Sequence, residues 1–335
     1  MGRVSTHGEG AYRVNNPIWS QLLQDVMPGR VAKPRLSGLT MVIDTGTPPT
    51  MVRDILQLSA LHIDFWKFGF GSAAVCPPEC IANKVAMCQE YGVLAYPGGT
   101  SMEIAVTQGV WKEYMEALWE GGVRVVEVSD GTIDLSAKQR RELIRTARKK
   151  GFTVLSEIGK KRRGVYFPPE RMAQLIQTDL NSGAHYVIVE GREGGKEVGV
   201  FDAQGCVRGD MVRKLVELLG PLATRLIWEA PLTEQQVYYI QEFGHKVNLG
   251  NIKPLDVVSL ESLRRGLRSD TLRSALGIME DEVLLAVPDE SGNDEHAREP
   301  NVIQFGLTKP TLWTDGGEPA PSTKWRNDRK DQRPH

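Results

Sequence analysis

The sequence lacks any long apolar run. None of its 335 residues lies in an apolar stretch of the roughly 18 residues that a membrane span needs, and the N-terminus does not resemble a signal peptide. Charge of one sign is also missing, since 41 basic residues face 42 acidic ones and the net charge is -1. A balanced charge gives no general attraction to nucleic acid or to a membrane surface. We therefore expect a cytoplasmic protein with neither of these partners.

Cysteine is scarce as well. The chain has four cysteines, Cys76, Cys80, Cys88 and Cys206, and the first two form the segment "CPPEC". A structural zinc site needs four ligands, and no second cysteine pair or histidine cluster supplies the others. We interpret the four cysteines as reduced structural thiols.

What the sequence does have is a regular alternation of short apolar runs and longer segments with helical periodicity. Each run is rich in β-branched or aromatic residues, which favour strands. The eight runs are "LTMVID", "IDFWKFG", "VLAYPGG", "VRVVEVSDG", "FTVLSEIGK", "HYVIVEGRE", "RLIWEAP" and "KVNLGNI".

The intervening segments are predicted to be amphipathic helices. In and just before "SAKQRRELIRTARKKG" the apolar Leu135, Leu143, Ile144 and Ala147 can share one face while the basic residues point outward. Ser136 is a suitable N-cap, and Gly151 is a suitable end of this helix. A strand followed by a helix, repeated eight times, predicts an α/β fold of the (β/α)8 TIM barrel type, with a doubly wound open sheet as the alternative.

The two ends of the chain do not follow this alternation. Residues 1–35 carry few periodic apolar positions and are interpreted as an N-terminal extension to a single barrel domain over residues 36–273. Residues 274–335 are interpreted as a partly flexible C-terminal extension, because much of this segment is polar and rich in proline, glycine and charge.

Ionisable and amide side chains stand at the ends of the predicted strands. The carboxyl ends of the strands in a TIM barrel open onto the active site, so these residues are candidates for chemistry. Burying so many charges without partners is too costly, and they must pair with one another, bind a metal or bind a charged ligand. They are Asp44, Lys67, Glu127, Asp130, Glu157, Lys160, Glu190, Arg192, Glu229, Asn248 and Asn251.

The mixture of acids and bases indicates a class of chemistry. Carboxylate oxygens suit Mg²⁺ better than zinc, while lysine and arginine beside them suit an anionic substrate such as a phosphate or a carboxylate. A lysine close to Mg²⁺ is also typical of sites that handle enolate-like intermediates. Structural ion pairs are the alternative explanation for any single residue of the set.

Several motifs together resemble the phosphosulfolactate synthase family. The resemblance covers residues 33–273, and its motifs occur in the same order and at similar spacings. The motifs are "DFWKFGFGSA", "YPGGTSMEIA", "VEVSDGTIDLS", "VLSEIGKK", "YVIVEGREGG", "FDAQGCVR", "IWEAPLTEQQVYYIQEFG", "VNLGNI" and "LESLRRGLRSDTLR". The resemblance implies a homo-oligomeric (β/α)8 lyase that adds sulfite to phosphoenolpyruvate with Mg²⁺, in a route to coenzyme M or to sulfolactate.

The resemblance also implies roles for individual residues. Lys160 of "EIGKK" is the expected general acid, and Lys161 is the alternative. The remaining candidates fall into two groups by role. Glu157, Glu190 and Glu229 are expected to hold Mg²⁺, whereas Lys67, Arg192, Asp44 and the backbone of Gly250 and Asn251 are expected to bind substrate.

One position departs from the family pattern. The segment "DTG" has Thr45 where the family usually carries a lysine, which removes a positive charge from a site for two anions. Two alternatives therefore stay open: a barrel lyase or isomerase acting on another phosphorylated carboxylate, and a noncatalytic stress or interaction paralogue.

Overall fold

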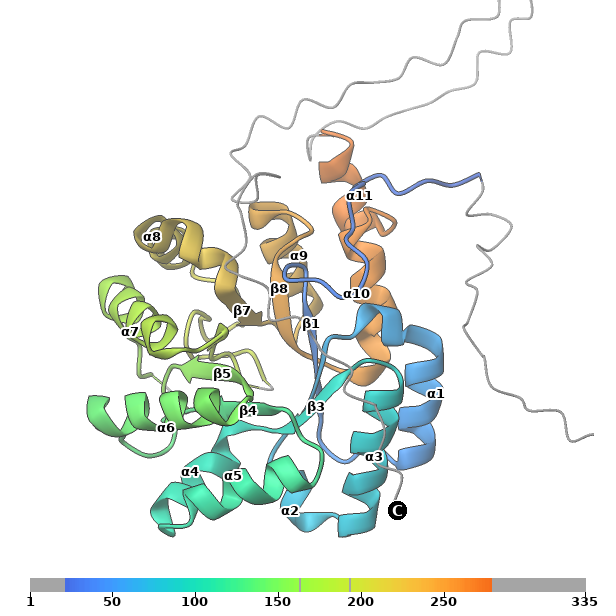
Figure 1. Ribbon diagram of the computed structural model, residues 1–335. Helices are drawn as coiled ribbons and strands as arrows, with labels where there is room; N and C mark the ends of the chain where they lie inside the picture. The colour runs from blue at the N-terminus through green and yellow to red at the C-terminus, as the bar shows by residue number, and fades with distance from the viewer. Residues whose placement is uncertain (1–21, 163, 193, 279–335) are drawn as a thin grey trace, which may run out of the picture.

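The computed structural model describes residues 22–162, 164–192 and 194–278, in which eight parallel strands form one sheet (Figure 1). The sheet order is β3-β2-β1-β8-β7-β6-β5-β4, and β3 and β4 lie side by side at the seam. The strands are β1 (Thr40–Asp44), β2 (Phe65–Phe68), β3 (Leu94–Pro97), β4 (Val125–Val128), β5 (Thr153–Ile158), β6 (Tyr186–Val189), β7 (Leu226–Glu229) and β8 (Asn248–Ile252). The sheet thus curls into a nearly closed barrel, which confirms the predicted TIM barrel.

Helices surround this barrel on its outer side (Figure 1). They are α1 (Pro49–Ser59), α2 (Ser72–Val75), α3 (Pro78–Glu90), α4 (Gly99–Thr107), α5 (Trp111–Glu120), α6 (Ala137–Lys150), α7 (Pro169–Ser182), α8 (Gly209–Leu219), α9 (Thr233–Phe243), α10 (Val257–Arg264) and α11 (Ser269–Ala275). Short 3₁₀ turns over Ala60–His62, Gly220–Arg225 and Pro254–Asp256 precede β2, β7 and α10. No helix among the described residues is long and apolar enough to cross a membrane.

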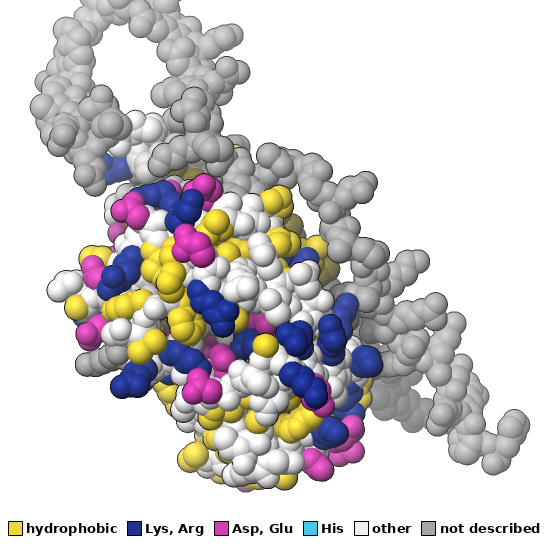
Figure 2. Space-filling model, turned by 90° about the vertical axis from the view of Figure 1, so that its left-hand side faces the viewer, with side chains coloured by type: hydrophobic (Ala, Val, Ile, Leu, Met, Phe, Trp, Pro, Cys, Tyr) yellow, Lys and Arg dark blue, Asp and Glu magenta, His cyan; other side chains and the backbone are white. Residues whose placement is uncertain are grey.

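Helix α6 follows the amphipathic pattern of its sequence. Its N-cap is Ser136, whose hydroxyl accepts a hydrogen bond from the backbone N–H of Gln139, and Gly151 ends the helix in the left-handed conformation. Leu143, Ile144 and Ala147 are buried against the sheet. The opposite face carries exposed basic residues, including Lys138, Arg145 and Lys149, and lysines and arginines gather across this side of the molecule in Figure 2.

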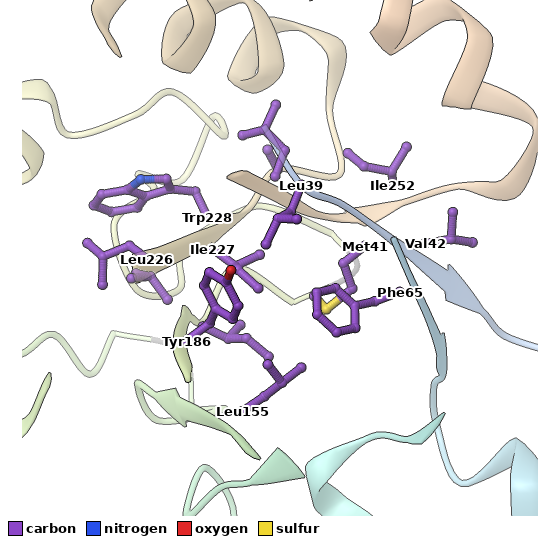
Figure 3. Packing of buried hydrophobic residues seen from close by; sticks show 14 of the residues in the cluster. Leu39, Met41, Val42, Phe65, Leu155, Tyr186, Leu226, Ile227, Trp228 and Ile252 are labelled. Atoms are coloured by element: carbon purple, nitrogen blue, oxygen red, sulfur yellow. The ribbon is translucent and has the colours of Figure 1, made fainter. Parts of the chain in front are cut away.

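The apolar core fills the barrel from the amino ends of the strands. Side chains of a strand alternate in direction, so the residue two positions before an inward-facing charge also points inward. Phe65 precedes Lys67 in this way, Leu155 precedes Glu157, and Ile227 precedes Glu229. Figure 3 shows Phe65, Leu155 and Ile227 directed toward one another inside the barrel, and all three are buried. This apolar layer lies directly beneath the charged layer, nearer the amino ends of the strands.

The described part of the predicted N-terminal extension is fastened to the barrel. Arg30 Nε lies 3.0 Å from a carboxylate oxygen of Glu261 on α10, and Arg35 Nη2 lies 2.8 Å from Asp64 Oδ2. The predicted barrel boundaries at residues 36 and 273 enclose all eight strands, although α11 spans the second boundary. Residues 1–21 and 279–335, which make up most of the two predicted extensions, lie outside the described residues.

His185, just before β6, makes the stability of the fold depend on pH. Burial, together with the charges of Arg148 and Arg225, lowers its pKa from 6.5 to about 4. As the pH falls from 6.5 to 4, protons bind the unfolded chain more readily than the folded one. The contribution of this residue to the free energy of unfolding is therefore complete above pH 6.5 and is lost on acidification.

We expect a His185→Gln variant to lose less stability than the parent protein between these two pH values, since glutamine does not titrate. Urea unfolding measured at a series of pH values checks this expectation. Parallel pH profiles for the variant and the parent protein would show that His185 does not contribute.

Candidate active site

A ring of buried charge lies at the carboxyl ends of the strands, with Lys67 of β2 at its centre. Lys67 Nζ lies 3.1 Å from Glu127 Oε1, 3.3 Å from Glu157 Oε2 and 3.2 Å from Glu229 Oε1. These carboxylates come from β4, β5 and β7, and each is at most 2% exposed. The strands converge on one ammonium group because inward-facing positions of parallel strands meet at the same end of the barrel.

A second lysine, Lys161, approaches the ring from the loop that follows β5. Its Nζ lies 3.0 Å from Glu157 Oε1 and 3.8 Å from Glu190 Oε2, and its side chain remains 23% exposed. Lys161 also donates a hydrogen bond to Thr100 Oγ1 at 3.2 Å. This lysine therefore connects the buried carboxylates with the open end of the barrel.

Backbone N–H groups complete the contacts of the ring. Glu229 Oε2 accepts hydrogen bonds from the N–H groups of Gly191 (2.9 Å) and Arg192 (3.0 Å). The Arg192 N–H also donates to Glu190 Oε1 at 2.7 Å. On the opposite side, Glu127 accepts from the Gly99 N–H at 2.6 Å and from the Tyr96 hydroxyl at 2.9 Å.

Carboxyl groups outnumber ammonium groups in the ring. Four buried carboxylates, those of Glu127, Glu157, Glu190 and Glu229, face the two ammonium groups of Lys67 and Lys161. Burial raises the pKa of Glu190 well above its ordinary range, and the charges of Glu157 and Glu229 raise it further. Burial also opposes ionisation of Glu157, but the ammonium groups of Lys161 and Lys67 outweigh it and lower that pKa. Glu190 is thus the group that most needs additional positive charge.

Three of these carboxylates meet the geometric needs of a cation site. One oxygen each from Glu157, Glu190 and Glu229 lies within 4.8 Å of the other two. Glu157 Oε1 and Glu190 Oε2 are buried and accept no hydrogen bond from the described residues, although Lys161 Nζ forms ion pairs with both. Three carboxylate oxygens so close together fit a hard divalent cation such as Mg²⁺.

The structure separates the two consecutive lysines that the sequence offered as the acid. Lys160 turns away from the carboxylate ring and donates to the carbonyl oxygens of Asp130 (2.6 Å) and Ile133 (3.0 Å) and to Asp134 Oδ1 (2.8 Å). Only Lys161 contacts the ring. Lys161 therefore lies beside the carboxylates, whereas the Lys160 ammonium donates its hydrogen bonds to the loop after β4.

Asp44 and Lys67, two of the predicted substrate-binding residues, are both engaged by other groups of the protein. Asp44 Oδ1 accepts from two backbone N–H groups of the following loop, while Oδ2 accepts from Trp66 Nε1 at 3.0 Å and Lys84 Nζ at 2.7 Å. Asp44 therefore shapes the loop that contains the exposed Thr45. Lys67 is surrounded by three carboxylates, whose charge its ammonium group balances.

The remaining predicted substrate residues lie together at the ends of β6 and β8. Asn251 Nδ2 donates to the carbonyl oxygen of Arg192 at 3.1 Å, and both residues have positive φ angles, 54° and 56°. Gly250 lies so close to Met41 that a Cβ atom would come within 2.4 Å of Met41 Cε. The backbone here is closely packed and strained, as is common at functional sites.

Sequence reasoning did not assign four residues that shape the site. Glu127 was recognised as a strand-end charge without a role, whereas Tyr96, Thr100 and Lys84 were not considered. The signal for Tyr96 was available, because it occupies an inward position two residues before the glycines of "YPGGT". The ion pair of Lys84 with Asp44 joins α3 to β1 across 40 positions in the sequence. Local sequence patterns do not predict a contact between residues so far apart.

A nearly closed barrel of eight parallel strands, with buried carboxylates and lysines gathered at their carboxyl ends, defines a TIM-barrel enzyme. Residues 28–270 match the family described as (2R)-phospho-3-sulfolactate synthase (ComA). The chain belongs to this family, as the resemblance of its motifs predicted.

Relatives of known sequence agree with this assignment. The chain is 41% identical over 247 residues to the phosphosulfolactate synthase of Methanothermobacter thermautotrophicus, an alignment that covers 73% of this chain and 95% of the relative. It is 42% identical to that of Methanocaldococcus jannaschii, covering 70% and 93% of the two chains. Identity to the Bacillus subtilis phosphosulfolactate synthase is 34%, covering 73% and 96%.

The central position of Lys67 leads to a test of the ring itself. We expect Lys67→Met to lower the free energy of unfolding by about 3–5 kcal/mol, because it leaves three buried carboxylates without their shared cation. Urea unfolding at neutral pH measures this loss. The matched control is Lys214→Met, which removes an exposed lysine 3.2 Å from Glu217 and is expected to cost less than about 1 kcal/mol. Equal losses in the two variants would contradict the central role of Lys67.

Proposed function

We propose that this protein adds sulfite to phosphoenolpyruvate in an Mg²⁺-dependent reaction and releases phosphosulfolactate. The names of its relatives support the product, and the excess of buried carboxylate over ammonium in the ring supports the need for a divalent cation. The observation that carries the proposal is the cluster of Glu157, Glu190 and Glu229 beside Lys161. In this proposal the cluster supplies a cation site and a proton donor at the same end of the barrel.

In this proposal Glu157, Glu190 and Glu229 hold the cation. When bound, Mg²⁺ supplies a positive charge that stabilises negative charge developing on a substrate carboxylate. The N–H groups of Gly191 and Arg192 and the ammonium of Lys67 hold Glu229 in place. The protein thus fixes the carboxylates before the cation arrives.

Lys161 is the proposed proton donor. The sulfur of sulfite forms a bond to the methylene carbon of phosphoenolpyruvate, and the electron pair of the double bond moves to the carbon that bears the carboxylate and the phosphate. Lys161 Nζ then gives a proton to that carbon. Burial lowers the pKa of Lys161, but Glu157 and Glu190 outweigh burial and raise it, so the amine carries its proton before the reaction starts.

Arg192 remains the proposed residue for the phosphate or for sulfite, because its backbone is fixed beside Glu190 and Glu229. The backbone at Gly250 and Asn251 is the proposed second contact for phosphate. The exposed Thr45, which stands where the family usually has a lysine, keeps a second candidate function in view: a reaction on another phosphorylated carboxylate, or a noncatalytic role.

Incubation of the purified protein with phosphoenolpyruvate, sulfite and Mg²⁺ tests the proposal directly. We expect a phosphorylated sulfonate, detectable by ³¹P NMR and mass spectrometry, and we expect excess EDTA to abolish its formation. A preparation that makes no product, while a synthase from one of the relatives does so under the same conditions, would favour the second candidate function.

A pair of adjacent variants tests the proton donor. Lys161→Met is expected to lower kcat by about 10²-fold or more, the usual contribution of a general acid, whereas Lys160→Met should retain kcat within about 10-fold. Steady-state kinetics on both variants decide between the two lysines. The reverse order of losses would restore Lys160 as the acid.

A further inference from the structure

Arg140 is a buried arginine on α6 that forms no hydrogen bond to any side chain assigned to the reaction. It is 6% exposed, and its guanidinium meets the fully buried Asp179 of α7 through Nε, at 2.9 and 3.0 Å, and through Nη2, at 2.6 Å. This pair alone would join two neighbouring helices. The remaining contacts of Arg140 point toward the barrel.

Those contacts reach the ends of two strands. Nη1 donates to Asp130 Oδ1 at 3.0 Å, just after β4, and Nη2 donates to the backbone carbonyl oxygen of Glu157 at 2.8 Å, in β5. Glu157 is a carboxylate of the ring. Arg140 thus fixes the backbone of one proposed cation ligand and the side chain of the residue that follows the neighbouring strand.

Asp130 and Gly131 form a dipeptide that contacts both lysines after β5, and we call this dipeptide the seat. Lys160 Nζ donates to the Asp130 carbonyl oxygen at 2.6 Å and lies 3.8 Å from Asp130 Oδ2. The Lys161 N–H donates to the Gly131 carbonyl oxygen at 3.0 Å. The stem of Lys161 lies against Gly131, where an added Cβ would come within 3.0 Å of Lys161 Cγ and Cδ. The direction of each lysine therefore depends on where this dipeptide sits.

We propose that Arg140 is a positioning residue of the active site. It donates hydrogen bonds to Asp130 and to the Glu157 carbonyl oxygen, and it thereby fixes the position of the seat. The seat in turn directs Lys161 toward the carboxylate ring and Lys160 away from it. The inference rests on the proposed function only in naming Lys161 as the proton donor. A guanidinium suits this task because its planar fork serves several acceptors at once in fixed directions. Lysine in its place keeps the charge and loses the fork.

The experiment compares the parent protein with Arg140→Lys and with the matched control Arg35→Lys. Arg35 is also buried and also forms two hydrogen bonds to one carboxylate, that of Asp64, but Asp64 receives the Thr40 N–H at the start of β1, far from the ring along the strand. Both variants lose a buried arginine-carboxylate pair and should lose stability. Only Arg140→Lys should disturb Lys161.

Two readouts are taken on folded full-length protein. Competitive labelling with an amine reagent, followed by mass spectrometry, reports the reactivity of Lys161 without any substrate. We expect Arg140→Lys to raise the labelling rate of Lys161 by about fivefold or more and to lower kcat by about 10–100-fold, with KM for phosphoenolpyruvate within about threefold, as outlying partners of a site typically do. Arg35→Lys should stay within about twofold of the parent protein in each readout.

The result that would overturn the inference is an Arg140→Lys protein with the labelling rate and kcat of the Arg35→Lys control, because Arg140 would then serve stability alone. If Arg140→Lys does not fold, Asp130→Ala replaces it, since that change removes the carboxylate that accepts from Arg140 Nη1 and leaves the pair with Asp179. Unchanged labelling in Asp130→Ala would equally contradict the inference. If the parent protein makes no phosphosulfolactate, the proposed function fails and the labelling readout still decides the role of Arg140.

Discussion

The rest of the structure depends on how four carboxyl groups can be buried together at the carboxyl ends of the barrel strands. Each of them would be intolerable there as an isolated charge, since desolvation of an ion in a protein interior costs several kcal/mol even after relaxation. The ammonium group of Lys67 offsets part of this desolvation cost, because it lies within 3.3 Å of three carboxylates. The ammonium group of Lys161 offsets another part, at 3.0 Å from Glu157. Two ammonium groups thus face four carboxyl groups, a shortage of cationic partners that is met in part by the raised pKa of Glu190.

This shortage links the fold to the proposed chemistry. The strand ends of the barrel hold oxygens of Glu157, Glu190 and Glu229 within 4.8 Å of one another. Backbone N–H groups at Gly191 and Arg192 fix two of these carboxylates from behind. The proposed cation site and the ammonium group of Lys161 thus lie at the same end of the barrel.

Much of this arrangement could be predicted from the sequence. The alternation of apolar runs and helical segments gave the barrel, because a parallel sheet needs a crossover after every strand. The charges at the strand ends could be gathered into one site because parallel strands end at the same mouth. Glu157, Glu190 and Glu229 were identified in this way, and the structure brings them together.

What could not be predicted depends on side chains far apart in sequence or on the exact course of a loop. Lys160 and Lys161 are the same residue type at consecutive positions, so the sequence does not distinguish them. The directions of their side chains depend on the backbone at Gly159, which has a φ of 125°, and on the position of Asp130. An added Cβ at Gly159 would lie 2.6 Å from Glu190 Cβ, so the loop passes the ring at a distance that only glycine permits. The ion pair of Asp44 with Lys84 could not be predicted for a similar reason, since Asp44 lies in β1 and Lys84 lies on α3, 40 positions later.

The most direct test of the central claim is to locate a divalent cation in crystals of this protein. Mn²⁺ takes the same oxygen ligands as Mg²⁺ and gives an anomalous X-ray signal. The account predicts one strong anomalous peak among Glu157, Glu190 and Glu229, about 2 Å from a carboxylate oxygen of each. Well-ordered carboxylates with no peak among them at saturating Mn²⁺, and with their charges cancelled by Lys67 and Lys161 alone, would contradict it.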